Sequence, residues 1–329
     1  VKGKAGLPSR NRTRKLEPLA EEAREALSAL LQDALSVVSV RLAEVSRGSG
    51  VNIVNATGWW LDVPRFMQGL GPNQLAREFV RDALAPRWVA PVLERMPEIA
   101  RVFDSPFAHG DLSLKARHRL ARELAREGYQ RAYILPNSIK SALIPFFADI
   151  PERIGFVCET RYGLMNRRHT LNKALLPQMA ERFAQLAEPP GTALPRPLPR
   201  PRLRSTGAQR AATLAALGIE IPERLAVFCP GAEYGPAKRW PERHFAALAN
   251  ALADHGYAVW LLGSAKDRAI GEDIVSRTDA ARLPLNLCGA TSLSQAIDLL
   301  AAASFVVCND SGLMHVAAAL DRPIVALYG

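Results

Sequence analysis

Short apolar runs alternate with longer amphipathic segments over residues 205–329. Each short run predicts a strand, and each longer segment, in which apolar positions recur every three or four residues, predicts a helix. The predicted strands are 225–229, 257–263, 285–288, 304–308 and 323–328, and the predicted helices are 241–254, 266–276, 293–303 and 312–320. Such alternation is typical of a parallel sheet with helices on both faces. Residues 205–329 therefore predict a Rossmann-like α/β domain.

The chain before residue 187 shows the same alternation less regularly. Strand-like runs lie at 51–55, 81–84 and 132–135, and helical segments lie at 89–95, 113–127 and 138–147. Residues 51–186 therefore predict a second, related sheet. Residues 187–204 contain six prolines, whose fixed φ and missing N–H disfavour a helix or a central strand, and they predict the linker. Residues 1–50 form an N-terminal extension of unknown role, with helical character over 19–45.

Two α/β domains facing each other across a cleft form an architecture common to many sugar-nucleotide transferases. The length of 329 residues suits two domains of about 100–200 residues each. Charge separates the two halves, because residues 51–204 hold 23 Lys and Arg against 14 Asp and Glu, whereas residues 205–329 hold 10 against 12. A basic first domain predicts an anionic partner, and both nucleic acid and anionic lipid fit. The alternative is that basic segments such as 115–126 are solvated helix faces.

The remaining composition favours a soluble, cytoplasmic protein. No stretch approaches the roughly 20 apolar residues of a membrane-spanning helix, and we expect no signal peptide. The cysteines are isolated, and three of them end apolar runs, where a free thiol behaves as a small hydrophobe; the four are Cys158, Cys229, Cys288 and Cys308. We therefore expect a reducing compartment, no disulfide framework and no metal site.

The strongest candidate site follows the predicted strand 304–308. Asp310, Ser311, Gly312 and His315 fall at the end of this strand and in the first turn of the next helix. Unpaired N–H groups and the helix dipole favour an anion there, and Gly312 allows close approach of a pyrophosphate. The alternative is plain helix capping by Asp or Ser.

Further candidates lie in three loops at the ends of neighbouring predicted strands. Lys238, in the loop 230–241, is suited to stabilising charge on a departing diphosphate, or else is a solvated surface lysine. Asp267, just beyond the strand 257–263, is placed to hold ribose hydroxyls, or else caps its helix. Thr291 and Leu293 could contact a nucleobase, although capping by Thr291 or Ser292 is the stronger interpretation.

The first half offers a candidate base and a candidate acceptor loop. Asp62 follows the predicted strand 51–55, and a carboxylate there could deprotonate an acceptor hydroxyl, or else cap the next segment. Asn137, Ser138 and Lys140 join the strand 132–135 to a helix, and Lys140 could bind an acidic acceptor.

Five tracts, taken in order, closely resemble a known family. They are LPNSIKSALIPFFADIP, PGAEYGPAKRWP, GSAKD, GATSL and NDSGLMH. Together they resemble the ADP-heptose:lipopolysaccharide heptosyltransferases, glycosyltransferase family 9, and within it the heptosyltransferase II members. The resemblance runs from about residue 51 to residue 329. The lysine-containing loop PGAEYGPAKRWP distinguishes the heptosyltransferase II members from the heptosyltransferase I members.

The resemblance implies a GT-B fold and a transfer of L-glycero-D-manno-heptose from ADP-heptose to the inner-core heptose of lipopolysaccharide, with inversion. It implies no cofactor and no metal, ADP-heptose and the lipopolysaccharide acceptor as partners, no nucleic acid, and peripheral contact with the cytoplasmic face of the inner membrane. Lys238 would hold the diphosphate and Asp267 the ribose. Asp310 to His315, including Leu313, would hold the pyrophosphate and heptose, and Asp62 falls where the family has its catalytic base.

Two departures from the family keep rival functions open. Leu61 stands where the family has a glycine before the base, and the chain stops at Gly329, where family members continue, so that we expect the donor domain to be truncated. These features motivate a nucleotide-binding remnant without catalysis as one alternative. A sugar-nucleotide epimerase or hydrolase on the same fold is the other.

Overall fold

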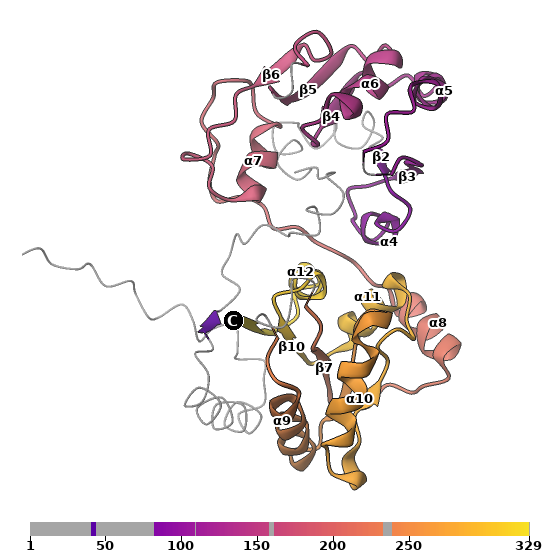
Figure 1. Ribbon diagram of the computed structural model, residues 1–329, viewed down its shortest axis with the longest axis vertical. Helices are drawn as coiled ribbons and strands as arrows, with labels where there is room; N and C mark the ends of the chain where they lie inside the picture. The colour runs from indigo at the N-terminus through magenta and orange to yellow at the C-terminus, as the bar shows by residue number, and fades with distance from the viewer. Residues whose placement is uncertain (1–40, 44–81, 109, 158–160, 233–238, 329) are drawn as a thin grey trace, which may run out of the picture. The chain divides into compact units, whose positions relative to one another are not determined.

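The computed structural model describes residues 82–108, 110–157, 161–232 and 239–328, together with the backbone of residues 41–43. The chain divides into two compact units (Figure 1). Unit 1 comprises Val1–Ser46 and Arg202–Gly329, and unit 2 comprises Arg47–Pro201. The proposed base Asp62, its neighbour Leu61, and Lys238 lie outside the described residues.

Unit 1 is built on a six-stranded sheet with the strand order β1-β11-β10-β7-β8-β9. Its strands are β1 (Arg41–Ala43), β7 (Leu225–Cys229), β8 (Ala258–Leu261), β9 (Leu285–Asn286), β10 (Phe305–Asn309) and β11 (Ile324–Tyr328). All neighbours are parallel except β1, which pairs antiparallel with β11. The carboxyl ends of β7 to β11 therefore share one edge of the sheet.

Helices connect these strands. They are α8 (Gly207–Leu217), α9 (Glu242–Asp254), α10 (Arg268–Ser276), α11 (Leu293–Ala302) and α12 (Gly312–Ala319), with short 3₁₀ turns η4 (Ala265–Asp267) and η5 (Ala280–Arg282). Local sequence sets several of their ends. Thr206 begins α8 with a capping box to Gln209, and Gly218 ends it in the left-handed conformation at φ 64°, as is typical of helix boundaries.

One hydrophobic core cluster of unit 1 lies between the sheet and the helices α9 and α10. Every residue of β7 and β10 is buried, as expected for central strands of a parallel sheet. Phe228 of β7 packs against Phe245 of α9 with ring centroids 5.6 Å apart. A buried carboxylate, Asp298 of α11, accepts hydrogen bonds from Ser205 Oγ at 2.6 Å and Thr213 Oγ1 at 2.8 Å. These bonds attach α8 and the segment before it to the rest of the unit.

Unit 2 contains two smaller parallel sheets. One pairs β2 (Asp82–Ala85) with β3 (Arg101–Asp104), and the other has the order β4 (Arg131–Ile134), β5 (Glu152–Phe156), β6 (Arg167–His169). The helices are α4 (Ala90–Leu93), α5 (Leu114–Ala125), α6 (Ile139–Phe147) and α7 (Met179–Gln185). Buried residues of α5 and α6 form one core cluster with Leu84 of β2, Phe103 of β3 and Ala132 of β4. Both sheets thus contribute to one core.

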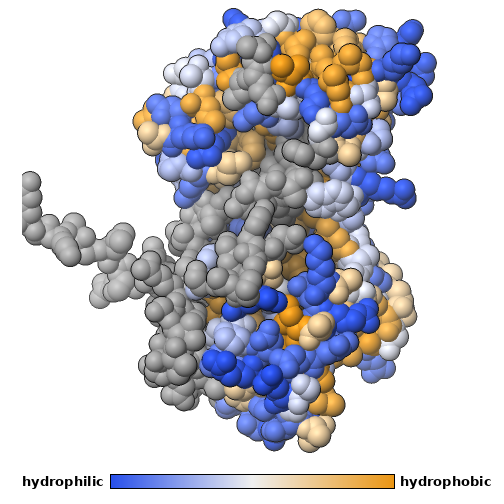
Figure 2. Space-filling model, in the orientation of Figure 1, coloured by the Kyte–Doolittle hydropathy of each residue, from blue (hydrophilic) through white to orange (hydrophobic). Residues whose placement is uncertain are grey.

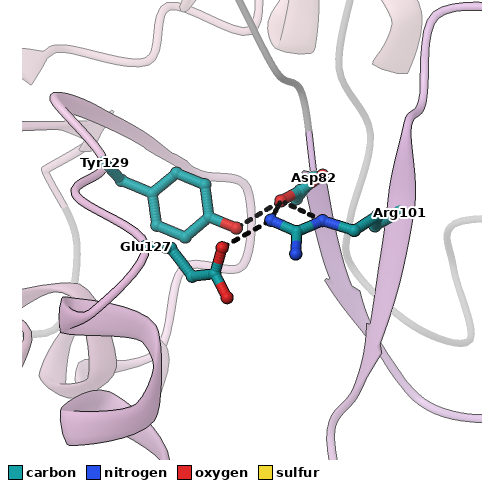
Figure 3. A network of polar contacts seen from close by, with 4 residues as sticks. All are labelled: Asp82, Arg101, Glu127 and Tyr129. Carbon is teal, nitrogen blue, oxygen red and sulfur yellow. Dashed lines mark hydrogen bonds and ion pairs between the residues drawn. The ribbon is translucent and has the colours of Figure 1, made fainter.

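A polar network also joins the β2–β3 sheet to the connection between α5 and β4 (Figure 3). Arg101 of β3 donates to Asp82 of β2 at 2.6 Å and to Glu127 at 2.6 Å. The Tyr129 hydroxyl, two residues before β4, donates to the same carboxylate oxygen of Asp82. Burial raises the pKa of Tyr129, and its bond to Asp82 raises it further. Tyr129 therefore stays protonated at neutral pH and acts as a donor.

The predicted α/β class is confirmed, and most predicted elements occur within a few residues of their expected bounds. The predicted strand 225–229 coincides with β7, and the predicted helix 138–147 corresponds to α6. The helical expectation for 19–45 is wrong at Arg41–Ala43, which pairs with β11; a free sheet edge offers unpaired backbone groups that override local propensity. The predicted strand 51–55 lies outside the described residues. In the part of the chain that the structure describes, no helix is both long and apolar enough to cross a membrane.

Candidate functional site

The loops that the sequence predicts as donor-binding gather at the carboxyl edge of the unit 1 sheet. The polar segments after β7, β8, β9 and β10 all emerge there, because these strands are parallel neighbours. Brought together at this edge are Asp267, Thr291, Leu293, Asp310, Ser311, Gly312, Leu313 and His315. This edge is where α/β sheets bind nucleotides.

The first turn of α12 has polar groups that no described residue satisfies. Ser311 is the N-cap residue, but its side chain makes no capping hydrogen bond. Within the described residues, Ser311 Oγ and His315 Nδ1 are buried without a hydrogen-bond partner. A Cβ at Gly312 would have open space around it. Side-chain capping by Ser311 therefore does not occur, and the turn is suited to bind an anion.

His315 is neutral in this setting. Its side chain is 6% exposed, and burial lowers its pKa, an effect that the nearby Asp310 carboxylate partly opposes. A neutral imidazole can donate from one nitrogen and accept at the other. His315 is therefore suited to hydrogen-bonding a polar ligand rather than to pairing with its charge.

Asp267 lies against the backbone of two loops. Its carboxylate accepts hydrogen bonds from Ser264 N at 2.8 Å and Ser264 Oγ at 2.7 Å, so it forms a capping box for η4. A Cβ at Gly231 would lie 2.5 Å from Asp267 Oδ1, and a Cβ at Gly263 would lie 2.9 Å from Asp267 Cβ. Asp267 therefore caps η4, whereas its side chain makes no capping hydrogen bond to α10, the helix that follows. The carboxylate can lie this close to the backbone of residue 231 because glycine has no Cβ. The ribose-binding role of Asp267 stays a prediction.

Ser292 is the capping residue of the β9–α11 connection. Its hydroxyl accepts from Gln295 N at 3.3 Å, and the Gln295 side chain accepts from Ser292 N at 2.8 Å. This confirms the capping interpretation at Ser292. Thr291 and Leu293 flank it, each partly exposed, and their role toward a nucleobase stays a prediction.

Asn309 is a site residue that the sequence interpretation missed. It ends β10, is fully buried, and lies directly before Asp310. Its amide nitrogen donates to Pro230 O at 2.7 Å, and its amide oxygen accepts from Trp240 N at 3.1 Å. One side chain thus holds both ends of the loop that contains Lys238. The sequence signals at this position were a polar residue ending an apolar run and its place at the start of the NDSGLMH tract.

The predicted acceptor loop of unit 2 is held by a buried arginine. Arg161 is 1% exposed and donates to Pro136 O at 2.6 Å and Phe156 O at 2.6 Å. Weaker bonds reach Asn137 Oδ1 and Ser138 O, each at 3.3 Å. Arg161 thereby fixes the β4–α6 loop against the end of β5.

A second buried arginine holds the same loop from its other side. Arg117 of α5 donates to Leu112 O at 2.7 Å, Asp111 O at 2.8 Å and Lys140 O at 3.1 Å. Its guanidinium also stacks over the ring of Phe107 at 4.0 Å from the centroid. The β3–α5 loop and the first turn of α6 are therefore joined through one side chain.

Asn137, Ser138 and Lys140 lie together at the start of α6. Ser138 is the N-cap residue, and its hydroxyl accepts from Ser141 N at 3.4 Å. Asn137 is exposed and Lys140 is partly exposed, so both are accessible to a ligand. Their role in acceptor binding stays a prediction.

The described cysteines are structural. Cys229, Cys288 and Cys308 are free and buried. Burial raises the pKa of the Cys288 thiol to about 12 and raises those of the other two strongly. All three are therefore protonated, unreactive thiols at neutral pH.

Comparison with known proteins gives matches over most of the chain. The family model described as glycosyltransferase family 9 (heptosyltransferase) matches residues 117–329. The lipopolysaccharide heptosyltransferase 2 of Salmonella typhimurium is 47% identical over 279 residues, which cover 82% of this chain and 80% of that protein.

Solved structures show the same relationship. The Escherichia coli ADP-heptose lipopolysaccharide heptosyltransferase II matches with a TM-score of 0.70 and 41% identity, over 82% of this chain and 80% of that one. An E. coli heptosyltransferase solved with ADP-2-deoxy-2-fluoro heptose matches with a TM-score of 0.56 at 24% identity, over 80% and 84% of the two chains. The latter likeness concerns the fold alone. Both neighbours have the GT-B fold, which is also the fold of this chain.

Proposed function

This chain belongs to glycosyltransferase family 9, the heptosyltransferases, and we propose that it transfers L-glycero-D-manno-heptose from ADP-heptose to the inner-core heptose of lipopolysaccharide. It is a glycosyltransferase of lipopolysaccharide core biosynthesis. The similarity to heptosyltransferase 2 over four fifths of the chain carries this proposal. The first turn of α12 supports it, because its Ser311 and His315 groups have no partner among the described residues and a departing diphosphate needs donors that are already in position.

The donor would bind at the carboxyl edge of the unit 1 sheet. We propose that the N–H groups of the α12 first turn, Ser311 Oγ and neutral His315 hold the diphosphate and heptose. Lys238 would add the positive charge that stabilises the leaving ADP, and Asp267 would accept from the ribose hydroxyls. Thr291 and Leu293 would contact the adenine.

The acceptor would bind at the start of α6. Asn137, Ser138 and Lys140 would contact its anionic core, and Asp62 would take the proton from the attacking heptose hydroxyl. Attack from the face opposite the departing ADP inverts the anomeric carbon. The bond that forms joins the acceptor oxygen to that carbon, the bond that breaks joins the carbon to the ADP oxygen, and the proton goes to Asp62.

We propose that the reaction requires no metal ion. Lys238 and the α12 N-terminus would together supply the positive potential that a divalent ion supplies in other transferases. Because the acceptor carries a lipid anchor, we also propose that the enzyme works at the cytoplasmic face of the inner membrane as a peripheral protein.

The test is a transfer assay with ADP-heptose as the donor. The acceptor is a lipopolysaccharide whose terminal sugar is the first inner-core heptose. We expect ADP release and a gain of one heptose in acceptor mass, both unchanged by EDTA. ADP release without a gain in acceptor mass would instead mean hydrolysis of the donor.

Two substitutions test the proposed roles in the same assay. Asp62→Asn should lower kcat by roughly 10²–10⁴-fold, as is usual for loss of a general base, while ADP binding measured by calorimetry stays intact. Lys238→Ala should lower kcat strongly, and Arg239→Ala, the adjacent cation, is its matched control. Equal effects of Lys238→Ala and Arg239→Ala would refute the specific role of Lys238.

A further inference from the structure

Four basic side chains form a single stripe on the exposed face of α5 and its C-cap residue. All four are exposed, and they are Lys115, Arg119, Arg122 and Arg126. Their spacing of i, i+4, i+7 and i+11 places them on one side of a helix with 3.6 residues per turn. The opposite side of α5 carries its buried residues. At about 1.5 Å per residue, the stripe is about 17 Å long.

No described residue forms an ion pair with this basic stripe. Among the described residues, none of its four members takes part in an ion pair. Other exposed arginines of unit 2 form ion pairs. Arg101 pairs with Asp82, and both Arg131 and Arg167 pair with Glu152. Like charges at i, i+4 destabilise a helix, so an unpaired stripe points to an anionic partner outside the chain.

An apolar face of α6 lies beside the basic stripe. Ile139, Leu143 and Phe146 are spaced at i, i+4 and i+7, and Ile139 and Phe146 are 37% and 39% exposed. The two helices touch through His118 and Phe147, whose ring centroids are 5.4 Å apart. Figure 2 shows the hydrophilic surface over α5 next to a hydrophobic patch over α6.

We propose that the basic stripe of α5 and the apolar face of α6 together form a docking surface for an anionic phospholipid bilayer. Basic residues attract anionic headgroups, and apolar side chains beside them enter the boundary between headgroups and acyl chains. Nucleic acid would use the basic stripe but would not bury the aliphatic residues of α6. The combination therefore favours a lipid surface.

The docking surface lies beside the predicted acceptor loop, which suggests its functional role. Arg117 joins the loop before α5 to Lys140 O in the first turn of α6, so the docking surface begins beside Asn137 and Ser138. A bilayer bound there would present a lipid-anchored acceptor next to the loop proposed to bind it. This inference rests on the proposed function for its purpose, although vesicle binding can be measured without it.

The experiment is sedimentation of the full chain with vesicles. One set contains phosphatidylcholine alone and the other contains phosphatidylcholine with phosphatidylglycerol. Arg119→Gln/Arg122→Gln should lower binding to the anionic vesicles about 25-fold, since each basic residue near an anionic surface contributes about five-fold. Phe146→Ser should lower it as well, with less dependence on salt.

The matched control is Arg168→Gln/Lys173→Gln, which removes the same charge from exposed positions of the same unit and should bind as the parent does. Equal binding by the stripe variant and the control would overturn the proposal. Strong binding of an oligonucleotide, with vesicle binding absent, would overturn it in favour of nucleic acid.

Heptose transfer separates this proposal from the proposed function. With a soluble acceptor oligosaccharide that has lost its lipid, the stripe variant should transfer heptose at the parent rate. With acceptor embedded in anionic vesicles, its rate should fall. A parental rate in vesicles would overturn the docking surface while leaving the transfer reaction intact, whereas absence of transfer by the parent itself would refute only the proposed function.

Discussion

The Asn309 amide oxygen accepts a hydrogen bond from Trp240 N at 3.1 Å, and both groups are buried. The amide nitrogen of the same side chain donates to Pro230 O at 2.7 Å. Pro230 and Trp240 are the two ends of the loop that contains Lys238, and Asp310 follows Asn309 directly. One buried amide therefore relates the lysine loop to the first turn of α12, the two parts of unit 1 that we propose to bind the donor diphosphate.

Asn309→Ala should weaken both stability and catalysis. It leaves two buried backbone groups without partners, each at a cost of roughly 1–3 kcal/mol, and a displacement of the loop by about 1 Å is expected to cost roughly 10²-fold in kcat/KM for ADP-heptose. Asn309→Asp keeps the acceptor for Trp240 N but not the donor to Pro230 O. Hydrogen exchange at the Trp240 amide should therefore accelerate in the Ala variant and stay slow in the Asp variant.

The control for Asn309 is Asn250, whose amide oxygen also accepts a backbone N–H, that of Asp279, at 3.1 Å. Asn250→Ala should leave the KM for ADP-heptose unchanged. If Asn250→Ala and Asn309→Ala lower kcat/KM alike, the effect is one of general stability and not of loop position.

Gly231→Ala should disturb Asp267. The added Cβ would lie 2.5 Å from the Asp267 carboxylate, so the carboxylate must move or the fold must lose roughly 1–3 kcal/mol through overpacking. In an Asp267→Ala background the same substitution should cost little, which a double-mutant cycle in urea unfolding measures. Gly207→Ala, where a Cβ has open space, is the control. Additive costs in the cycle would contradict the close approach.

Arg161→Met should raise the KM for the acceptor and leave that for ADP-heptose unchanged. The guanidinium holds Pro136 O, Ser138 O and Phe156 O at once, and Arg161→Lys should not rescue the KM because an ammonium lacks this planar fork. Arg153→Met is the control, since Arg153 also donates to carbonyls, Leu164 O and Ile150 O, which belong to other loops. Parallel increases in both KM values would contradict a role confined to the acceptor loop.

Strands that are buried throughout were predicted correctly from the sequence, whereas strands with many charged residues were not. Strands such as β7 and β10 are buried throughout, so their apolar runs were recognisable. The strands β3, β5 and β6 were not predicted, because much of their sequence is charged. β6 consists of Arg167, Arg168 and His169, and Arg167 reaches across to Glu152 of β5 at 3.0 Å. A strand stabilised by cross-strand ion pairs leaves no apolar signal.

The same distinction applies to the candidate site. The positions of Asp310 and Ser138 were predictable because each closely follows a predicted strand, Asp310 in unit 1 and Ser138 in unit 2. Asn309, Arg117 and Arg161 were not, because their roles depend on carbonyl groups that are distant in sequence. Arg161 reaches Pro136 O across 25 positions, and no local pattern specifies that contact.

His315→Asn should change how stability depends on pH. Burial lowers the pKa of His315 below its usual value of 6.5, so on acidification the unfolded chain takes up a proton before the folded chain does. The free energy of unfolding should therefore be fully retained above about pH 6.5 and should fall as the pH drops from there toward the folded-state pKa. Removing the imidazole removes this share of the loss, so the variant should lose less stability than the parent between about pH 6.5 and 5. Urea unfolding across this range measures the difference.

His169 and His244, whose pKa values burial also lowers, remain in the variant, so the slope of unfolding free energy against pH should decrease without vanishing. His118→Asn, on the exposed face of α5, serves as the control. If the His315 variant keeps the slope of the parent, burial does not make protonation of His315 unfavourable, and the prediction is wrong.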